Sequence, residues 1–192
     1  MIKKIYKKYE IIFNVIFFSI FPIVAFYLME FYEHNPFEEV RFMAGFFNII
    51  LFELIAWILY FVTGRAKWAL RVVFIVAMVF GLINHYVILF RSTPFVPWDI
   101  FSIGTATSVA SNYDFAPTAG VVVVTVIFIA LIVPMHFVDF RIKWKFRFRL
   151  IPTVLLILAL CLFVNVLQDE DFQTDNYLYP FLFTPAYMTK VN

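Results

Sequence analysis

Five long apolar runs, separated by polar connectors, dominate the pattern of hydrophobic and polar positions along the chain. They cover about residues 11–29, 42–63, 72–90, 118–137 and 150–167. Each run is close to the ~20 residues that an α-helix needs to cross a bilayer core of about 30 Å. The pattern therefore predicts an all-α, polytopic membrane protein, with five transmembrane helices in residues 1–167 and an aromatic tail in 168–192.

Two of the runs need a closer argument. The first follows the basic segment MIKKIYKKYE, as in a secretory signal, but it is longer than the ~7 to 15 apolar residues of a signal core and no small-residue cleavage site follows it. We expect it to be a retained helix. The fourth run is dense in valine, which favours strands in water. In hydrocarbon the backbone must pair internally, so a helix is expected there too.

The connector between the third and fourth runs, residues 84–115, is neither an apolar span nor a charged loop. Pro94 and Pro97 predict a turn at the membrane surface, and Asp99 is suited to cap a following helix. We expect a short interfacial helix over about residues 98–110 on the extracytoplasmic side. Either the stretch is only scaffold, or Arg91 and Asp99 also contact an anionic lipid headgroup, which a guanidinium suits.

The charges of the connectors alternate along the chain. With a cytoplasmic N-terminus, only Arg41, Arg91 and Lys190 among the basic residues would lie outside the cytoplasm. The basic residues expected inside are Lys3, Lys4, Lys7, Lys8, Arg65, Lys67, Arg71, Arg141, Lys143, Lys145, Arg147 and Arg149. Basic residues are enriched in the cytoplasmic loops of membrane proteins. We therefore predict a cytoplasmic N-terminus and an extracytoplasmic C-terminus.

Composition supports the membrane class and narrows the chemistry. Hydrophobic residues make up 64% of the chain, well above the roughly 45 to 50% of soluble domains. With 27 Phe and five Gly, bulky side chains rather than glycine stripes should fill the helix interfaces. The net charge of +2 gives no reason to expect a nucleic-acid partner, and the single cysteine, Cys161, excludes an intrachain disulfide.

Glu53 is the acidic residue within an apolar run. Such a group costs ~2.5 to 3.5 kcal/mol at the bilayer centre, so it is expected to face the bundle interior or to be protonated. It could contact a proton or a headgroup inside the bundle, or it could be a structural acid bonded to Asn14, Asn84 or Asn165 of a neighbouring helix. The three histidines lie too far apart in this topology to form a metal site, and no complete hydrolase motif is present.

The segment NHYVILFRSTPFVPWDIFSIGTATSVASNYDF resembles the N-terminal membrane region of the lipoteichoic acid synthase family. The resemblance is carried by Asn84, Phe90, Arg91, Pro94, Pro97, Asp99, Asn112 and Tyr113. Weaker support comes from Glu30 with Asn35-Pro36 and from LFTPAY in the tail. Members of this family are bacterial phosphoglycerol transferases, with five membrane helices and an extracellular sulfatase-like domain of the alkaline phosphatase superfamily.

The resemblance implies a module of the bacterial cell membrane that anchors and orients a catalytic domain and admits a phosphatidylglycerol-type lipid for cell-envelope polymer synthesis. The implied headgroup or interfacial motif consists of Asn84, Arg91, Pro94, Pro97, Asp99 and Tyr113. The family's threonine nucleophile and manganese-type metal belong to the extracellular domain, before which this chain is expected to stop. No catalytic residue, metal ligand or cofactor is therefore expected in it, and whether it is part of an enzyme stays open.

Several functions remain compatible with the sequence. The chain could be a shortened form of the enzyme or a stand-alone relative of its membrane half. A stand-alone form would be a non-enzymatic protein that binds lipid or a partner membrane protein. A small transporter using Glu53 as its coupling group is disfavoured, because no inverted pair of broken helices is apparent. Membrane lipids, and either an extracellular catalytic domain or a partner membrane protein, are the expected partners.

Overall fold

The computed structural model is helical, without strands, over the residues that it describes, which are 2–95, 99, 116–138, 141–169 and 172; at 2–11, 13, 91 and 137 only the backbone is described. Its helices are α1 (Ile2–Glu30), α2 (Pro36–Glu39), α3 (Phe42–Thr63), α4 (Ala66–Arg91), α6 (Ala119–Ile132), the 3-10 helix η2 (Pro134–Phe137) and α7 (Phe146–Gln168). The all-α fold class is confirmed. The predicted interfacial helix lies outside the described residues except for Asp99.

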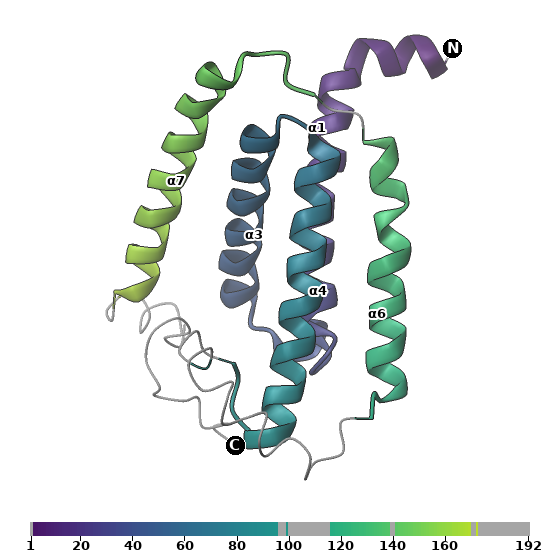
Figure 1. The fold of residues 1–192 in the computed structure, drawn as a ribbon, viewed down its shortest axis with the longest axis vertical. Coiled ribbons are helices and arrows are strands. Elements are labelled where there is room, and N and C mark those ends of the chain that lie inside the picture. The colour runs from purple at the N-terminus through teal and green to yellow at the C-terminus, as the bar shows by residue number, and fades with distance from the viewer. Residues whose placement is uncertain (1, 96–98, 100–115, 139–140, 170–171, 173–192) are drawn as a thin grey trace.

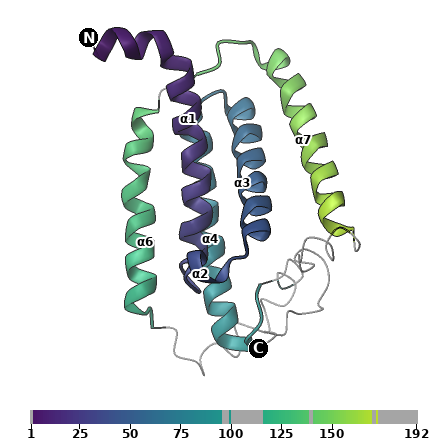
Figure 2. The ribbon, with the colours of Figure 1, turned by 180° about the vertical axis from the view of Figure 1, so that it is seen from behind.

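Four of these segments are long and apolar enough to cross a membrane, namely Phe42–Thr63, Ala66–Phe90, Ala119–His136 and Phe146–Gln168. A shorter apolar segment, Asn14–Glu30, lies within α1. The helices stand side by side, with α1 and α4 at the centre of the bundle (Figure 1). α3 packs against both of them, α6 covers α4 at one edge, and α7 packs against α3 at the other edge (Figures 1 and 2).

Two helix ends differ from the apolar runs for identifiable reasons. α4 begins at Ala66, six residues before the predicted run, and so includes Lys67 and Arg71. Its 26 residues measure ~39 Å, which exceeds a bilayer core, so the long basic side chains of its first turns can reach the headgroups. α6 gives way to η2 at Pro134, which has no N–H to donate to Ala130. The amide of Val133 donates to the Ala130 carbonyl instead, at 3.2 Å.

Aromatic side chains fill much of the core, as the composition predicts. Phe18 of α1 contacts Trp57 and Tyr60 of α3, with ring centroids 4.7 and 5.4 Å away. Phe74 of α4 lies between Phe21 of α1 and Phe128 of α6, at 5.9 and 5.6 Å. Small residues also take part, because the buried stripe of α4 combines Phe and Leu with alanine and glycine. That stripe contains Ala66, Ala69, Leu70, Val73, Phe74, Ala77 and Gly81.

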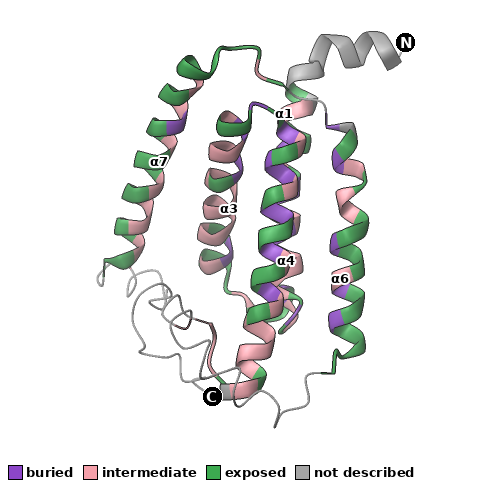
Figure 3. Ribbon diagram, in the orientation of Figure 1, coloured by how far each residue is buried: buried purple, intermediate pink, exposed green. Residues whose placement is uncertain are grey.

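The outward faces of the helices are apolar as well. α7 is the clearest case, with Ile151, Leu155 and Leu162 more than 60% exposed. Figure 3 shows exposed positions along the length of α7 and α6, and buried positions concentrated on α1 and α4. An apolar exterior of this extent is unfavourable in water and favourable in hydrocarbon. The described bundle is therefore that of a multi-pass membrane protein.

Candidate lipid-headgroup site at the acidic end

The two ends of the bundle carry opposite charge. The basic end is where α3 passes into α4 and where α7 begins; the Ile142 amide donates to the Gly64 carbonyl there, at 3.1 Å. It carries Arg65, Lys67, Arg71, Arg141, Lys143, Lys145, Arg147 and Arg149. The acidic end is where α1 passes through α2 into α3, and where α4 and α7 end. It carries Glu30, Glu33, Glu38, Glu39, Asp99 and Asp169.

The central stretch leaves α4 at the acidic end through a tight reversal. Ser92 adopts a left-handed conformation, with φ of 58°, and its amide donates to the Ile88 carbonyl at 2.7 Å. The Asn84 side-chain oxygen then accepts the Phe95 amide at 2.9 Å. The Phe95 ring also packs edge-on against Phe80, at 5.8 Å. Residues 92–95 are therefore folded back along α4, and Asn84 is the polar residue that fixes this reversal.

A histidine–glutamate contact holds the α1–α2 turn against α4 beside this reversal. Nδ1 of His85 lies 3.2 Å from Oε2 of Glu33. An ionised carboxylate can only accept, so the proton of this bond lies on Nδ1. Nε2 of His85 is buried and has no hydrogen-bond partner. Nε2 of His34 lies 3.3 Å from Glu30 in the same turn, so two of the glutamates at this end are paired with histidine.

Tyr32 attaches the same turn to α6. Its hydroxyl lies 2.9 Å from Oγ1 of Thr125. Because the Thr125 hydroxyl donates to the Val121 carbonyl at 2.8 Å, the Tyr32 hydroxyl is the donor of the shared bond. Burial raises the pKa of Tyr32, which keeps that proton in place. The turn after α1 is therefore tied to both α4 and α6.

The predicted motif is only partly covered by the described residues. Arg91 is the last residue of α4, and Pro94 and Asp99 are half-buried in the connector that follows. Pro97 and Tyr113 lie outside the described residues, and only the backbone of Arg91 is described. The contact between Arg91 and a headgroup therefore stays a prediction. The pairing of His85 with Glu33 was not predicted from the sequence. The signal available for it was the acidic connector after the first apolar run, which lies at the same predicted membrane face as the histidine near the end of the third run.

The chain beyond α7 begins at the same end. The Phe172 amide donates to the Asp169 side chain at 2.9 Å, closing a turn after the helix. The Phe172 ring lies 5.5 Å from Phe47 of α3, which also contacts Phe163 of α7 at 6.0 Å. Residue 172 is therefore packed against the beginning of α3. The central stretch and the start of the tail leave the bundle on one side, opposite the basic end.

Glu53 lies deeper in the bundle, half-buried on α3. Ser19 of α1 and Trp57 are its hydrogen-bonding neighbours. Its Oε1 atom is buried and has no hydrogen-bond partner. Two of the three asparagines expected to contact it bond elsewhere, since Asn84 accepts from Phe95 and Asn165 donates to the Cys161 carbonyl at 2.8 Å. Glu53 thus faces α1, where sequence analysis had no signal for Ser19.

In the described part of the chain, no three His, Cys, Asp or Glu side chains are grouped as metal ligands would be. No protein-family model, curated protein or solved structure matches this sequence. The fold and the chemistry of its two ends define a class, that of an all-helical, multi-pass membrane protein with a charged surface at each end.

Proposed function

We propose that this protein is the membrane module of a lipoteichoic acid synthase-like phosphoglycerol transferase of the bacterial cell membrane. In this role it anchors and orients an extracellular sulfatase-like domain and admits a phosphatidylglycerol-type lipid. The N-terminus is cytoplasmic in this proposal, and the acidic end faces the extracytoplasmic side. The manganese-type metal and the nucleophile of the reaction belong to the catalytic domain.

One observation carries the proposal: the end of α4 and the end of α7 lie at the same end of the bundle. The headgroup motif implied by the family resemblance follows α4, and the chain toward the tail follows α7. A domain attached after α7 would therefore sit above the surface where Arg91 can bind a phosphate. The basic end lies opposite, as basic loops do on the cytoplasmic side of a membrane.

The rigidity of this end also supports the proposal. The reversal held by Asn84 and the packing of Phe172 on Phe47 fix the described residues at the start of both segments that leave the bundle. A catalytic domain needs a fixed position relative to its lipid, because the reacting atoms must be held about 3 to 3.5 Å apart.

Lipid identification tests the binding half of the proposal. The purified protein is analysed by native mass spectrometry after incubation with equal amounts of phosphatidylglycerol and phosphatidylcholine. We expect preferential binding of phosphatidylglycerol and a loss of roughly ten- to hundredfold in Arg91→Ala, since a bidentate arginine–phosphate contact contributes roughly 1.5 to 3 kcal/mol. Arg41→Ala, which removes the same charge at the same end, is the control and should retain the preference.

The outcomes separate the alternatives. If Arg91→Ala and Arg41→Ala lose binding equally, the lipid is held by general charge and the motif is scaffold. If the protein shows no preference for phosphatidylglycerol, the lipid-admitting role is wrong. A sulfatase-like domain fused after residue 192 that is active toward phosphatidylglycerol only when joined to this bundle would support the anchoring role independently of the binding result.

A further inference from the structure

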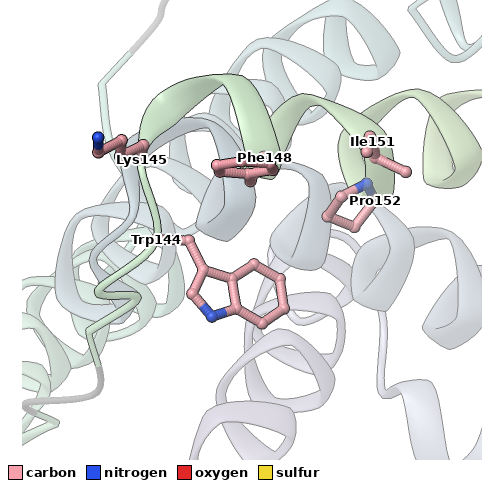
Figure 4. Close-up of a pocket in the computed structure, with 5 residues that line it drawn as sticks. All are labelled: Trp144, Lys145, Phe148, Ile151 and Pro152. Carbon is pink, nitrogen blue, oxygen red and sulfur yellow. The ribbon is translucent and has the colours of Figure 1, made fainter.

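A groove of about 520 Å³ lies at the basic end, beside the first turns of α7. Its lining consists of Trp144, Lys145, Phe148, Ile151 and Pro152. Trp144 comes from the connector before α7, and its indole lies opposite Phe148 and Pro152, which come from the first turns of the helix (Figure 4). Lys145 stands at one end of the groove and is its single cationic residue.

The sequence explains why the groove forms there. Lys145 precedes α7 in an extended conformation, with ψ of 148°, so the chain enters the helix at an angle and carries Trp144 to its side. Pro152 has no N–H to donate to the Phe148 carbonyl, and its compact ring leaves space on the helix surface. Trp144 and Ile151 remain 59% and 62% exposed. The groove is therefore an open apolar surface with a cation at one end.

Within the part of the chain that the structure describes, the cations beside the groove have no carboxylate partner. Lys145 makes no capping hydrogen bond, and neither Lys145 nor Arg147 forms an ion pair with a described carboxylate. Arg147 stacks over the Phe148 ring, with its guanidinium carbon 5.0 Å from the ring centroid. Two positive charges next to an apolar groove complement a molecule with an anionic head and an apolar body.

The apolar surface continues along α7. Ile151, Leu155, Leu158 and Leu162 are all more than half exposed and follow one another at spacings of three or four residues. Residues at these spacings lie on one face of a helix. The groove therefore opens onto a continuous apolar stripe that runs from the basic end toward the middle of the span. A lipid acyl chain has this length and direction, whereas a folded protein partner would need a polar rim.

We propose that this groove binds an anionic glycerophospholipid of the leaflet at the basic end. The phosphate lies at Lys145 and Arg147, the glycerol region lies beside Trp144, and one acyl chain follows Pro152, Ile151 and the stripe along α7. Tryptophan favours this depth because its indole is apolar yet carries a polar N–H. The site is in the opposite leaflet from the proposed headgroup motif after α4, so it does not depend on the proposed function.

Quenching of Trp144 by brominated lipids tests the proposal. The protein is reconstituted into phosphatidylcholine vesicles containing 20 mol% of either brominated phosphatidylglycerol or brominated phosphatidylcholine, where ~20 mol% approximates the anionic content that attracts basic segments. The Trp144 signal is the difference between the parent and Trp144→Phe. We expect brominated phosphatidylglycerol to quench Trp144 more strongly, because bromine on a bound acyl chain stays next to the indole.

Two matched variants assign the preference to the groove. Lys145→Gln should reduce the preference about fivefold, because each lysine near an anionic surface contributes about 1 kcal/mol. Lys143→Gln removes the same charge two residues away, outside the groove, and should leave the preference unchanged. Equal quenching by both brominated lipids, or an equal loss in the two variants, would overturn the proposal. The Arg91→Ala variant should quench like the parent, which separates this site from the one after α4.

Discussion

Tyr32 of the turn after α1 packs directly against Gly81 of α4. A Cβ at this position would lie 2.6 Å from Cδ2 of Tyr32 and 3.2 Å from Cγ of Met29. The first distance is shorter than any real contact, and Tyr32 is held by its bond to Thr125. The glycine is therefore required by packing rather than by its backbone conformation, which is helical.

We predict that Gly81→Ala destabilises the bundle. Overpacking of a filled interface costs typically ~1 to 3 kcal/mol, which exceeds the gain of roughly 1 kcal/mol from replacing a helical glycine by alanine. Gly120→Ala is the control, because a Cβ there would meet only Oγ1 of Thr118, at 3.9 Å. Thermal unfolding in detergent should show a lower midpoint for Gly81→Ala and an equal or higher midpoint for Gly120→Ala. A Gly81→Ala variant as stable as the parent would contradict the packing described for Tyr32.

Glu53 leads to a second prediction at this scale. Its Oε1 atom is buried without a hydrogen-bond partner. Burial of the carboxyl group therefore lowers the free energy of unfolding by more than the hydrogen bonds to Ser19 and Trp57 raise it. We expect Glu53→Gln to be about as stable as the parent and Glu53→Leu to be more stable by about 1 kcal/mol. The free energies of unfolding of both variants and of the parent are measured in mixed detergent. A Glu53→Leu bundle that is less stable than the parent would show that the acid contributes to structure, through Ser19 and Trp57.

Between elements, a polar contact of Glu33 with His85 joins the turn after α1 to α4, in addition to the packing of Tyr32 on Gly81. The side chains of Glu33 and His85 are separated by 3.2 Å, with 31% and 13% of their respective surfaces exposed. Partial exposure screens the charges, which keeps the interaction small. We predict a coupling free energy of ~0.5 to 1 kcal/mol between Glu33→Gln and His85→Ala in a double-mutant cycle. In each single variant the backbone amides of residues 31–39 should exchange faster, by an amount that corresponds to ~0.5 to 1 kcal/mol less free energy of local opening.

A contrasting pair provides the control for this cycle. Glu38 is exposed and lies on α2, so Glu38→Gln combined with His85→Ala should give no coupling. Additivity is the normal result for residues that share no contact. If Glu38 coupled to His85 as strongly as Glu33 does, the turn would be held by general charge rather than by this ion pair.

Much of the fold follows from hydropathy, and the reason is physical. A span of apolar residues in hydrocarbon must satisfy its own backbone, so even the valine-rich α6 has to be helical. Details that depend on distant partners do not follow. The antiparallel pairing of Arg65 with Arg141 joins residues far apart in the sequence, and the 3-10 turn at Pro134 depends on how its neighbours compensate for a missing donor.

The candidate site was less predictable than the fold. Sequence analysis selected Asn84 as a headgroup residue, but its oxygen is used to hold the Phe95 amide. That bond spans eleven residues and depends on the left-handed Ser92, which no hydropathy pattern reveals. Arg91 and Asp99 were chosen for the chemistry of their side chains, which suits a phosphate wherever the backbone places them. Their contact with a headgroup therefore remains a prediction, and it rests on the type of side chain rather than on its position in the structure.

At the scale of the whole molecule, the separation of charge between the two ends is a property of the fold. Five helices that alternate in direction bring connectors from distant parts of the chain to the same end, so the backbones of Arg65 and Arg141 pair there. The Arg149 guanidinium lies against Gly64, whose φ of 70° allows the chain to turn from α3 into α4. The basic residues thus form one surface rather than scattered loops, which increases their attraction to anionic headgroups.

This arrangement leads to the last prediction, which concerns orientation. Positive loops stay on the cytoplasmic side during insertion, so the basic end should be cytoplasmic. In a Cys161→Ser background, a membrane-impermeant maleimide should label Glu38→Cys in intact cells, and Lys143→Cys only after the cells are permeabilised. Both positions are exposed, so access rather than burial determines labelling. The opposite pattern would place the end of α4 and Phe172 in the cytoplasm, and an extracellular catalytic domain could then not be attached after α7. Labelling of both positions in intact cells would mean that the bundle inserts in two orientations, which the one-sided distribution of lysine and arginine argues against.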